Sequence, residues 1–165
     1  MEAALVAGLN LGRATLDTLS NDLSKQSRAA ATQLSDVSDS QSGLALEKIR
    51  EQLGVSDVAL WTSSGRMVAS SGATRFQIRA ERPSTTQMKT ARQKGSVDWI
   101  EGIEDSIPGG DQGRIKVLVL VPQVGLAFDE DRRYLQITQE LPPTLVNNAL
   151  EVQTANREYL SLIHI

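Results

Sequence analysis

Residues 57–70, DVALWTSSGRMVAS, have the pattern of a β-hairpin. The first strand runs from Asp57 to Thr62, a turn of Ser, Gly and Arg follows, and a second strand returns from Met67 to Ser70. Gly65 suits the turn because glycine adopts positive φ without a steric penalty. We therefore expect a fold organised around an antiparallel sheet.

Three more segments are expected to be strands of this sheet, at residues 97–100, 114–121 and 133–141. Apolar side chains occupy both faces of 114–121, which is typical of a strand with neighbours on both sides. The segment IPGGDQG at 107–113 predicts a turn before it, and Pro122 ends it. The expected fold is α+β, with about five antiparallel strands in one sheet and the helices packed on one side of it.

The remaining segments have helical patterns. Apolar residues recur at a spacing of seven from Leu5 to Val37, which predicts one long helix. A second helix is expected at 42–53, ended by Gly54, and a short one at 85–94, ended by Gly95. A last helix is expected from residue 144 onward. We divide the chain into an N-terminal helical segment (1–54), a sheet core (55–141) and a C-terminal helix (142–165), all within one structural domain.

The apolar stripe of the long helix has two interpretations. It pairs with its copy in a homodimer through Leu9, Leu16 and Leu23, or it packs on the sheet of its own chain. Gly12 and Gln26 interrupt the stripe and weaken the pairing. We favour the homodimer.

Composition excludes several classes of function. The chain has 165 residues, no cysteine and a formal net charge of −3, so disulfide scaffolds, thiolate zinc sites and catalytic thiols are excluded and nucleic-acid binding is disfavoured. His164 is the one histidine, and a lone histidine forms neither a metal site nor a catalytic triad. We expect no catalytic residue, no metal and no cofactor in this chain.

Three stretches together resemble one protein family. They are GLNLGRATLDTLSNDLSKQSRAAATQLSD (8–36), REQLGVSDVALWTSSGRMVASS (50–71) and LPPTLVNNALEVQTANREYLSL (141–162). They are similar to the extracytoplasmic sensor region of nitrogen-regulation-type (NtrY-like) membrane sensor histidine kinases. The resemblance implies a PAS-like (Cache-type) sensor core.

The resemblance also implies a parent protein of the inner membrane, with this domain in the periplasm and a cytoplasmic kinase core that uses ATP and Mg²⁺ to phosphorylate a response regulator. His164 lacks the acidic residue and the proline that follow the phospho-acceptor of such kinases. Kinase activity is therefore not expected in these residues. The C-terminal helix would carry the signal toward the membrane, with Pro142 and Pro143 as a rigid joint.

A basic segment suggests a ligand. Residues 75–94 carry a charge of +5, and in PAS-like modules the segment between the second and third strands covers the ligand pocket. We expect Arg79 and Arg82, with Arg75, to bind a small anion, and Trp61 and Trp99 to form apolar walls. The alternative is that these cations are solvated or face anionic lipid headgroups, and that the tryptophans are ordinary core residues.

Two other functions stay open at this stage. The chain could be the ectodomain of a chemoreceptor, or a structural spacer that sets dimer geometry and binds nothing. A ligand site under the 75–94 segment would argue against the spacer.

Overall fold

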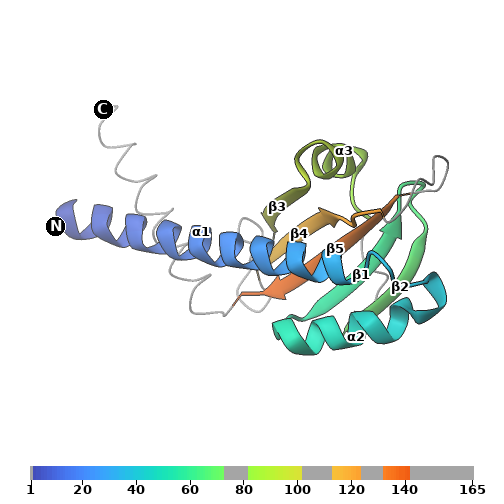
Figure 1. Ribbon diagram of the computed structural model, residues 1–165. Coiled ribbons are helices and arrows are strands. Elements are labelled where there is room, and N and C mark those ends of the chain that lie inside the picture. The colour runs from blue at the N-terminus through green and yellow to red at the C-terminus, as the bar shows by residue number, and fades with distance from the viewer. Residues whose placement is uncertain (1, 73–81, 102–112, 124–131, 142–165) are drawn as a thin grey trace.

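The computed structural model describes residues 2–72, 82–101, 113–123 and 132–141, with side chains described from residue 14 onward (Figure 1). The predicted C-terminal helix, with Pro142 and Pro143, lies outside these residues, as does the loop at 107–112. Among the described residues, no helix has the length and apolar character needed to cross a membrane.

Five antiparallel strands form one sheet in the order β2-β1-β5-β4-β3. The hairpin of the opening motif is confirmed, and the turn at Gly65 has a φ of 88°. β4 lies between β5 and β3, as its two apolar faces predicted. The strand bounds are β1 (Asp57–Thr62), β2 (Met67–Gly72), β3 (Ser96–Glu101), β4 (Arg114–Leu120) and β5 (Arg133–Glu140).

The helices are α1 (Glu2–Gln33), α2 (Ser42–Leu53) and α3 (Thr85–Lys94), with a 3-10 turn η1 (Asp39–Gln41) before α2. Gly95 ends α3 in a left-handed conformation with a φ of 89°, as its sequence predicted. The start of α3 is fixed by a capping box, in which Ser84 and Gln87 each bond the other's backbone N–H.

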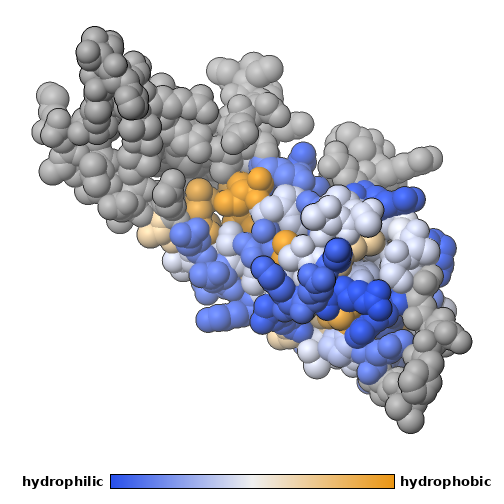
Figure 2. Space-filling view, turned by 90° about the horizontal axis from the view of Figure 1, so that it is seen from above, coloured by the Kyte–Doolittle hydropathy of each residue, from blue (hydrophilic) through white to orange (hydrophobic). Residues whose placement is uncertain are grey.

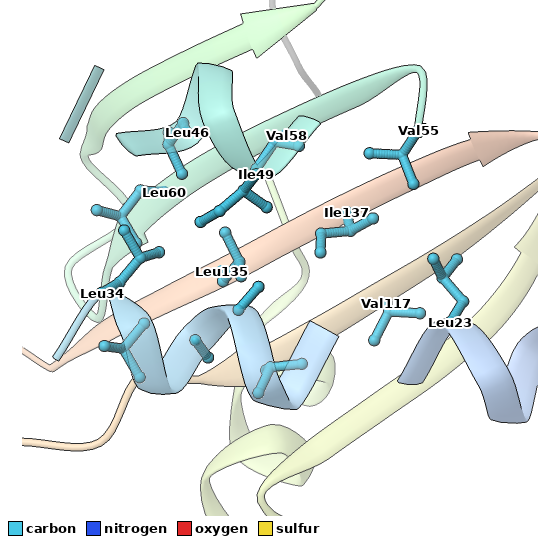
Figure 3. Close-up of a cluster of buried hydrophobic side chains, with 14 of the residues drawn as sticks. Leu23, Leu34, Leu46, Ile49, Val55, Val58, Leu60, Val117, Leu135 and Ile137 are labelled. Carbon is cyan, nitrogen blue, oxygen red and sulfur yellow. The ribbon is translucent and has the colours of Figure 1, made fainter. Parts of the chain in front are cut away.

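The larger hydrophobic core lies between the sheet and the two helices α1 and α2. Alternation along the strands places Val58, Leu60, Leu135 and Ile137 on this face of the sheet (Figure 3). Leu34, the residue directly after α1, packs into the same cluster and is fully buried. Together these elements confirm the α+β fold with a five-stranded antiparallel sheet and a long N-terminal helix.

One expectation about the helices is wrong. We expected all of them on one side of the sheet, but α3 packs on the opposite side from α1 and α2. Ala91 of α3 is buried in a second cluster with Trp61, Leu118 and Tyr134. This second cluster is built from odd-numbered residues of β1 and even-numbered residues of β4 and β5. The larger core is built from the even-numbered residues of β1 and the odd-numbered residues of β4 and β5.

The described part of the α1 stripe packs on the sheet of its own chain. Leu23 is buried in the larger core, and Leu16 is half-buried against it. The side chain of Leu9 lies outside the described residues. The N-terminal part of α1 extends beyond the sheet (Figure 1). The homodimer through Leu9, Leu16 and Leu23 therefore stays a prediction, with Leu23 already engaged within the chain.

Arg133 joins the central strand to the end of α1. Its guanidinium donates hydrogen bonds to the carbonyl oxygens of Val37 (2.8 Å) and Leu34 (2.9 Å) and pairs with Asp39 at 3.7 Å. These carbonyls follow the last turn of α1, where backbone acceptors have no partner within the helix. The contact therefore fixes the position of α1 relative to β5.

Candidate functional site

The side of the sheet that packs against α3, which we call the α3 face, carries both tryptophans of the chain. Strand pairing arranges its side chains in rows across the sheet. Trp61, Tyr134 and Leu120 form a row at one end, and Asp57, Thr138, Lys116 and Trp99 form a row near the other. The two ends differ in chemistry, because the first is mainly apolar and the second mainly polar.

At the apolar end, Trp61 makes a buried polar contact. Its Nε1–H donates to Gln136 Oε1 at 2.8 Å, and both residues are at most 5% exposed. Tyr134 is buried beside them, and Met88 of α3 packs on the same cluster. A buried glutamine on a central strand is costly unless its polar atoms are bonded, so Trp61 and Gln136 hold each other in place.

At the polar end, four side chains form what we call the Lys116 cluster: Lys116, Glu101, Arg114 and Trp99. Lys116 Nζ lies 3.2 Å from Glu101 Oε2, and Arg114 Nε lies 3.5 Å from the same oxygen. Trp99 Nε1–H donates to the other oxygen, Glu101 Oε1, at 2.7 Å. The Lys116 side chain is only 7% exposed, which is rare for lysine in a folded protein.

The Lys116 cluster keeps Glu101 ionised. Burial by itself raises the pKa of this carboxyl group, but the hydrogen bond from Trp99 and the charges of Lys116 and Arg114 outweigh it, so the pKa lies below its ordinary value of 4.5. Glu101 therefore remains an anion at neutral pH.

The structure brings some of the predicted ligand residues together and separates others. Trp61 and Trp99 pack on one cluster of the α3 face. Arg82 is exposed, and its guanidinium lies against the backbone of Gly65 in the β1–β2 turn. Arg75 and Arg79 lie outside the described residues. Anion binding by these three arginines stays a prediction.

Sequence reasoning missed four residues that give this face its polar character: Lys116, Arg114, Glu101 and Gln136. Lys116 and Arg114 stand in an otherwise apolar strand, and Glu101 lies one residue beyond the strand expected at 97–100. The available signal was a lysine surrounded by apolar residues on both sides in a strand with two buried faces. A lysine in such a strand must find a buried partner, and Glu101 is one of its partners.

The site offers binding chemistry. In the described ranges, no group of three or more histidine, cysteine, aspartate or glutamate side chains converges as a metal site. What the α3 face presents is two indole rings, a buried amide and a cluster of cations around one carboxylate. Aromatic walls with a few placed polar groups are typical of small-molecule sites.

Solved structures of other proteins share this fold. No protein-family model and no curated protein matches the sequence. The ligand-binding domain of the Campylobacter jejuni chemoreceptor Tlp3 is similar in structure: its complex with L-valine has a TM-score of 0.57 at 14% identity, covering 90% of this chain and 64% of that one.

The Tlp3 complex with L-norvaline has a TM-score of 0.60 at 13% identity, covering 90% of this chain and 62% of that one. The chain thus spans less than two thirds of the Tlp3 domain. The E. coli DcuS sensor domain aligns with a TM-score of 0.47 at 13% identity, covering 80% of this chain and 97% of that one, a score too low to carry an argument. The chain has the PAS-like (Cache-type) fold of such sensory domains, as predicted.

Proposed function

We propose that this chain is the extracytoplasmic sensing domain of a membrane receptor and that it binds a small ligand on the α3 face. The observation that carries the proposal is the concentration of buried polar groups on that face. The α1 side of β4 and β5 is filled by Ile115, Val117, Leu135 and Ile137, whereas the α3 side of the same strands holds Lys116 and Gln136. A sheet that served only as a core would not need them.

The Tlp3 domain supports the proposal by analogy. It has this fold and is described in complex with L-valine, L-norvaline and isoleucine. Proteins that share a fold need not bind the same ligand, so the proposal for this chain depends on the chemistry of its own α3 face. A receptor in the inner membrane with this domain in the periplasm is the setting that the sequence resemblance favours.

We infer that β5 would carry the signal from the site to the helices. β5 faces the site through Gln136 and faces the helices through Arg133, which holds the end of α1. A ligand that shifts β5 would favour one packing of α1 over another, provided that it binds the two arrangements with different affinity. Leu141 then leads to Pro142 and Pro143, the proposed joint to the C-terminal helix.

The finer proposal is that the parent is an NtrY-like sensor histidine kinase, homodimeric and acting on a response regulator, with ATP and Mg²⁺ bound only in a cytoplasmic kinase core. A chemoreceptor is the second candidate, favoured by the fold of Tlp3. The reading frame beyond Ile165 distinguishes them: we expect a membrane span and a histidine kinase core. If a methyl-accepting signalling domain follows instead, the parent is a chemoreceptor and not a sensor histidine kinase.

The direct test of sensing is a thermal-shift screen of the purified domain with amino acids, organic acids, phosphate and neutral metabolites. We expect at least one class to raise the Tm in wild type and not in a Trp61→Ala variant that retains its circular dichroism spectrum. A Lys48→Met variant, altered at an exposed position of α2 on the opposite side of the sheet, is the matched control. No response to any class would favour the structural spacer.

A further inference from the structure

The outward surface of α3, which faces away from the sheet, is rich in cations. Residues 82–97 contain no aspartate or glutamate but four cations, Arg82, Lys89, Arg92 and Lys94, although the whole chain has a net charge of −3. All four residues are exposed. Figure 2, which views the molecule from the α3 side, shows mainly hydrophilic side chains over this part of the surface. Within the described ranges, no ion pair includes any of these four side chains.

The described acidic residue nearest in sequence does not balance this charge. Asp98 follows α3 in β3, but it pairs with Val117 of the larger core and therefore lies on the α1 side of the sheet. Glu81 and the acidic stretch at 129–131 lie outside the described residues. The cations of α3 are thus available to a partner from outside the domain.

Helix stability accounts for only part of this charge. Arg92 and Lys94 are in the last turn of α3, where positive charge interacts favourably with the helix dipole. Lys89 lies one turn earlier, three residues from Arg92, so the two like charges are neighbours on the helix surface and repel each other. A glutamate at this position would form an ion pair with Arg92 instead. Lys89 therefore weakens the helix, which indicates a role in binding.

The cations are spread along a convex surface. Ala91 is the one buried side chain of α3, and Met88 packs partly on the second cluster, so the polar positions of the helix point outward. Lys89 and Lys94 are separated by about 8 Å along the helix axis, at a rise of 1.5 Å per residue. One small anion cannot contact both, whereas a surface with several carboxylates can.

The position of α3 favours a protein over an anionic bilayer. Arg28, in the C-terminal half of α1, donates hydrogen bonds to Ser96 Oγ at the start of β3 through Nε (3.0 Å) and Nη2 (2.6 Å). α3 therefore lies near the end of the sheet at which α1 finishes, and the N-terminal part of α1 extends beyond the sheet in the other direction (Figure 1). In the proposed receptor that part of α1 leads to the membrane, so α3 is turned away from it.

We propose that the outward surface of α3 is a docking site for the acidic surface of a partner protein, with Lys89 and Arg92 as its central cations. Complementary charge speeds the encounter of two proteins and selects the correct partner. The inference goes beyond the proposed function, because such a partner is a second input that differs from a small ligand on the α3 face. Only the choice of a protein over a bilayer depends on the orientation of the receptor.

The test is fluorescence anisotropy of a labelled oligoglutamate peptide titrated with the purified domain, with an oligoglutamine peptide as the uncharged control. We expect oligoglutamate alone to bind, and to bind more weakly as salt is added. The double variant Lys89→Glu/Arg92→Glu should weaken binding by about tenfold or more. Lys25→Glu/Lys48→Glu changes the net charge by the same amount at exposed positions of α1 and α2, and it should retain most of the affinity.

Both double variants should fold, since the substituted side chains are exposed; Lys89→Gln/Arg92→Gln replaces the α3 variant if circular dichroism shows that it does not. The inference is wrong if wild type does not bind oligoglutamate, or if the two double variants weaken binding equally, because net charge and not α3 would then govern it. It is also wrong if phosphatidylglycerol vesicles bind through α3 and oligoglutamate does not. None of these results affects the proposed function, which the thermal-shift screen tests with small ligands.

Discussion

Replacing Trp61 by phenylalanine tests whether the contact between Trp61 and Gln136 stabilises the α3 face. The indole Nε1–H is the donor to Gln136 Oε1, and Gln136 is 4% exposed, so water cannot readily replace it. A buried acceptor left without its donor costs about 1–3 kcal/mol, and the void beside the smaller ring adds about 1 kcal/mol. We expect Trp61→Phe to lower the free energy of unfolding by about 3 kcal/mol.

The assay is urea denaturation followed by circular dichroism, with thermal unfolding as a second measure. A loss of about 3 kcal/mol corresponds to a Tm lower by roughly 6–12 °C in a chain of this size. Trp99→Phe is the matched control: its acceptor Glu101 has a side chain 30% exposed, so water can replace the indole and we expect a loss of only about 1 kcal/mol.

A double-mutant cycle separates the hydrogen bond from the loss of ring volume. Gln136→Leu in the Trp61→Phe background removes both polar partners, so the double variant should be more stable than the sum of the single losses predicts, by at least about 1 kcal/mol. Additive losses, or a cost of Trp61→Phe below about 1 kcal/mol, would refute the reasoning.

Three further predictions concern charge and backbone. Folding lowers the pKa of Glu101, so its ionised form stabilises the folded state above the pKa of the unfolded chain, and this stabilisation is lost as the pH falls through the pKa of the folded state. The difference in unfolding free energy between wild type and Glu101→Gln, from urea titrations, should therefore shrink below about pH 4.5. A difference that stays constant with pH would contradict this. Gly43→Ala in α2 should raise the Tm, since the added Cβ meets open space, whereas Gly95→Ala should lower it by strain at φ 89°; equal shifts would contradict it. Arg133→Met should speed amide hydrogen exchange at the end of α1 while leaving α3 unchanged; unchanged exchange at α1 would show that Arg133 does not hold it.

The positions of the helices and strands could be predicted because local pattern specifies them. Gly54 and Gly95 end helices where a left-handed residue is required, and the hairpin turn is set by Gly65. The side of the sheet that a helix covers is not local. α3 has few apolar residues, and Ala91 is its one buried side chain. Its sequence therefore predicted a helix but did not show which face of the sheet the helix covers.

The candidate site was predicted only in part, for a similar reason. Trp61 and Trp99 are recognisable as large aromatic residues in any sequence. The Lys116 cluster depends on strand register, which pairs Trp99 with Lys116 and Glu101 with Arg114. That register follows from burial of the opposite face of the sheet, which involves all five strands and cannot be worked out from the residues of β3 and β4 alone.

The two indole N–H groups allow the most direct measurement of whether the α3 face is the binding site. The chain has two tryptophans, so a ¹⁵N-labelled sample has two indole signals, which Trp61→Phe and Trp99→Phe assign. On titration with a ligand identified in the screen, both signals should move with one Kd. A ligand that binds with neither indole signal moving, while backbone signals shift on the α1 side of the sheet, would contradict the account.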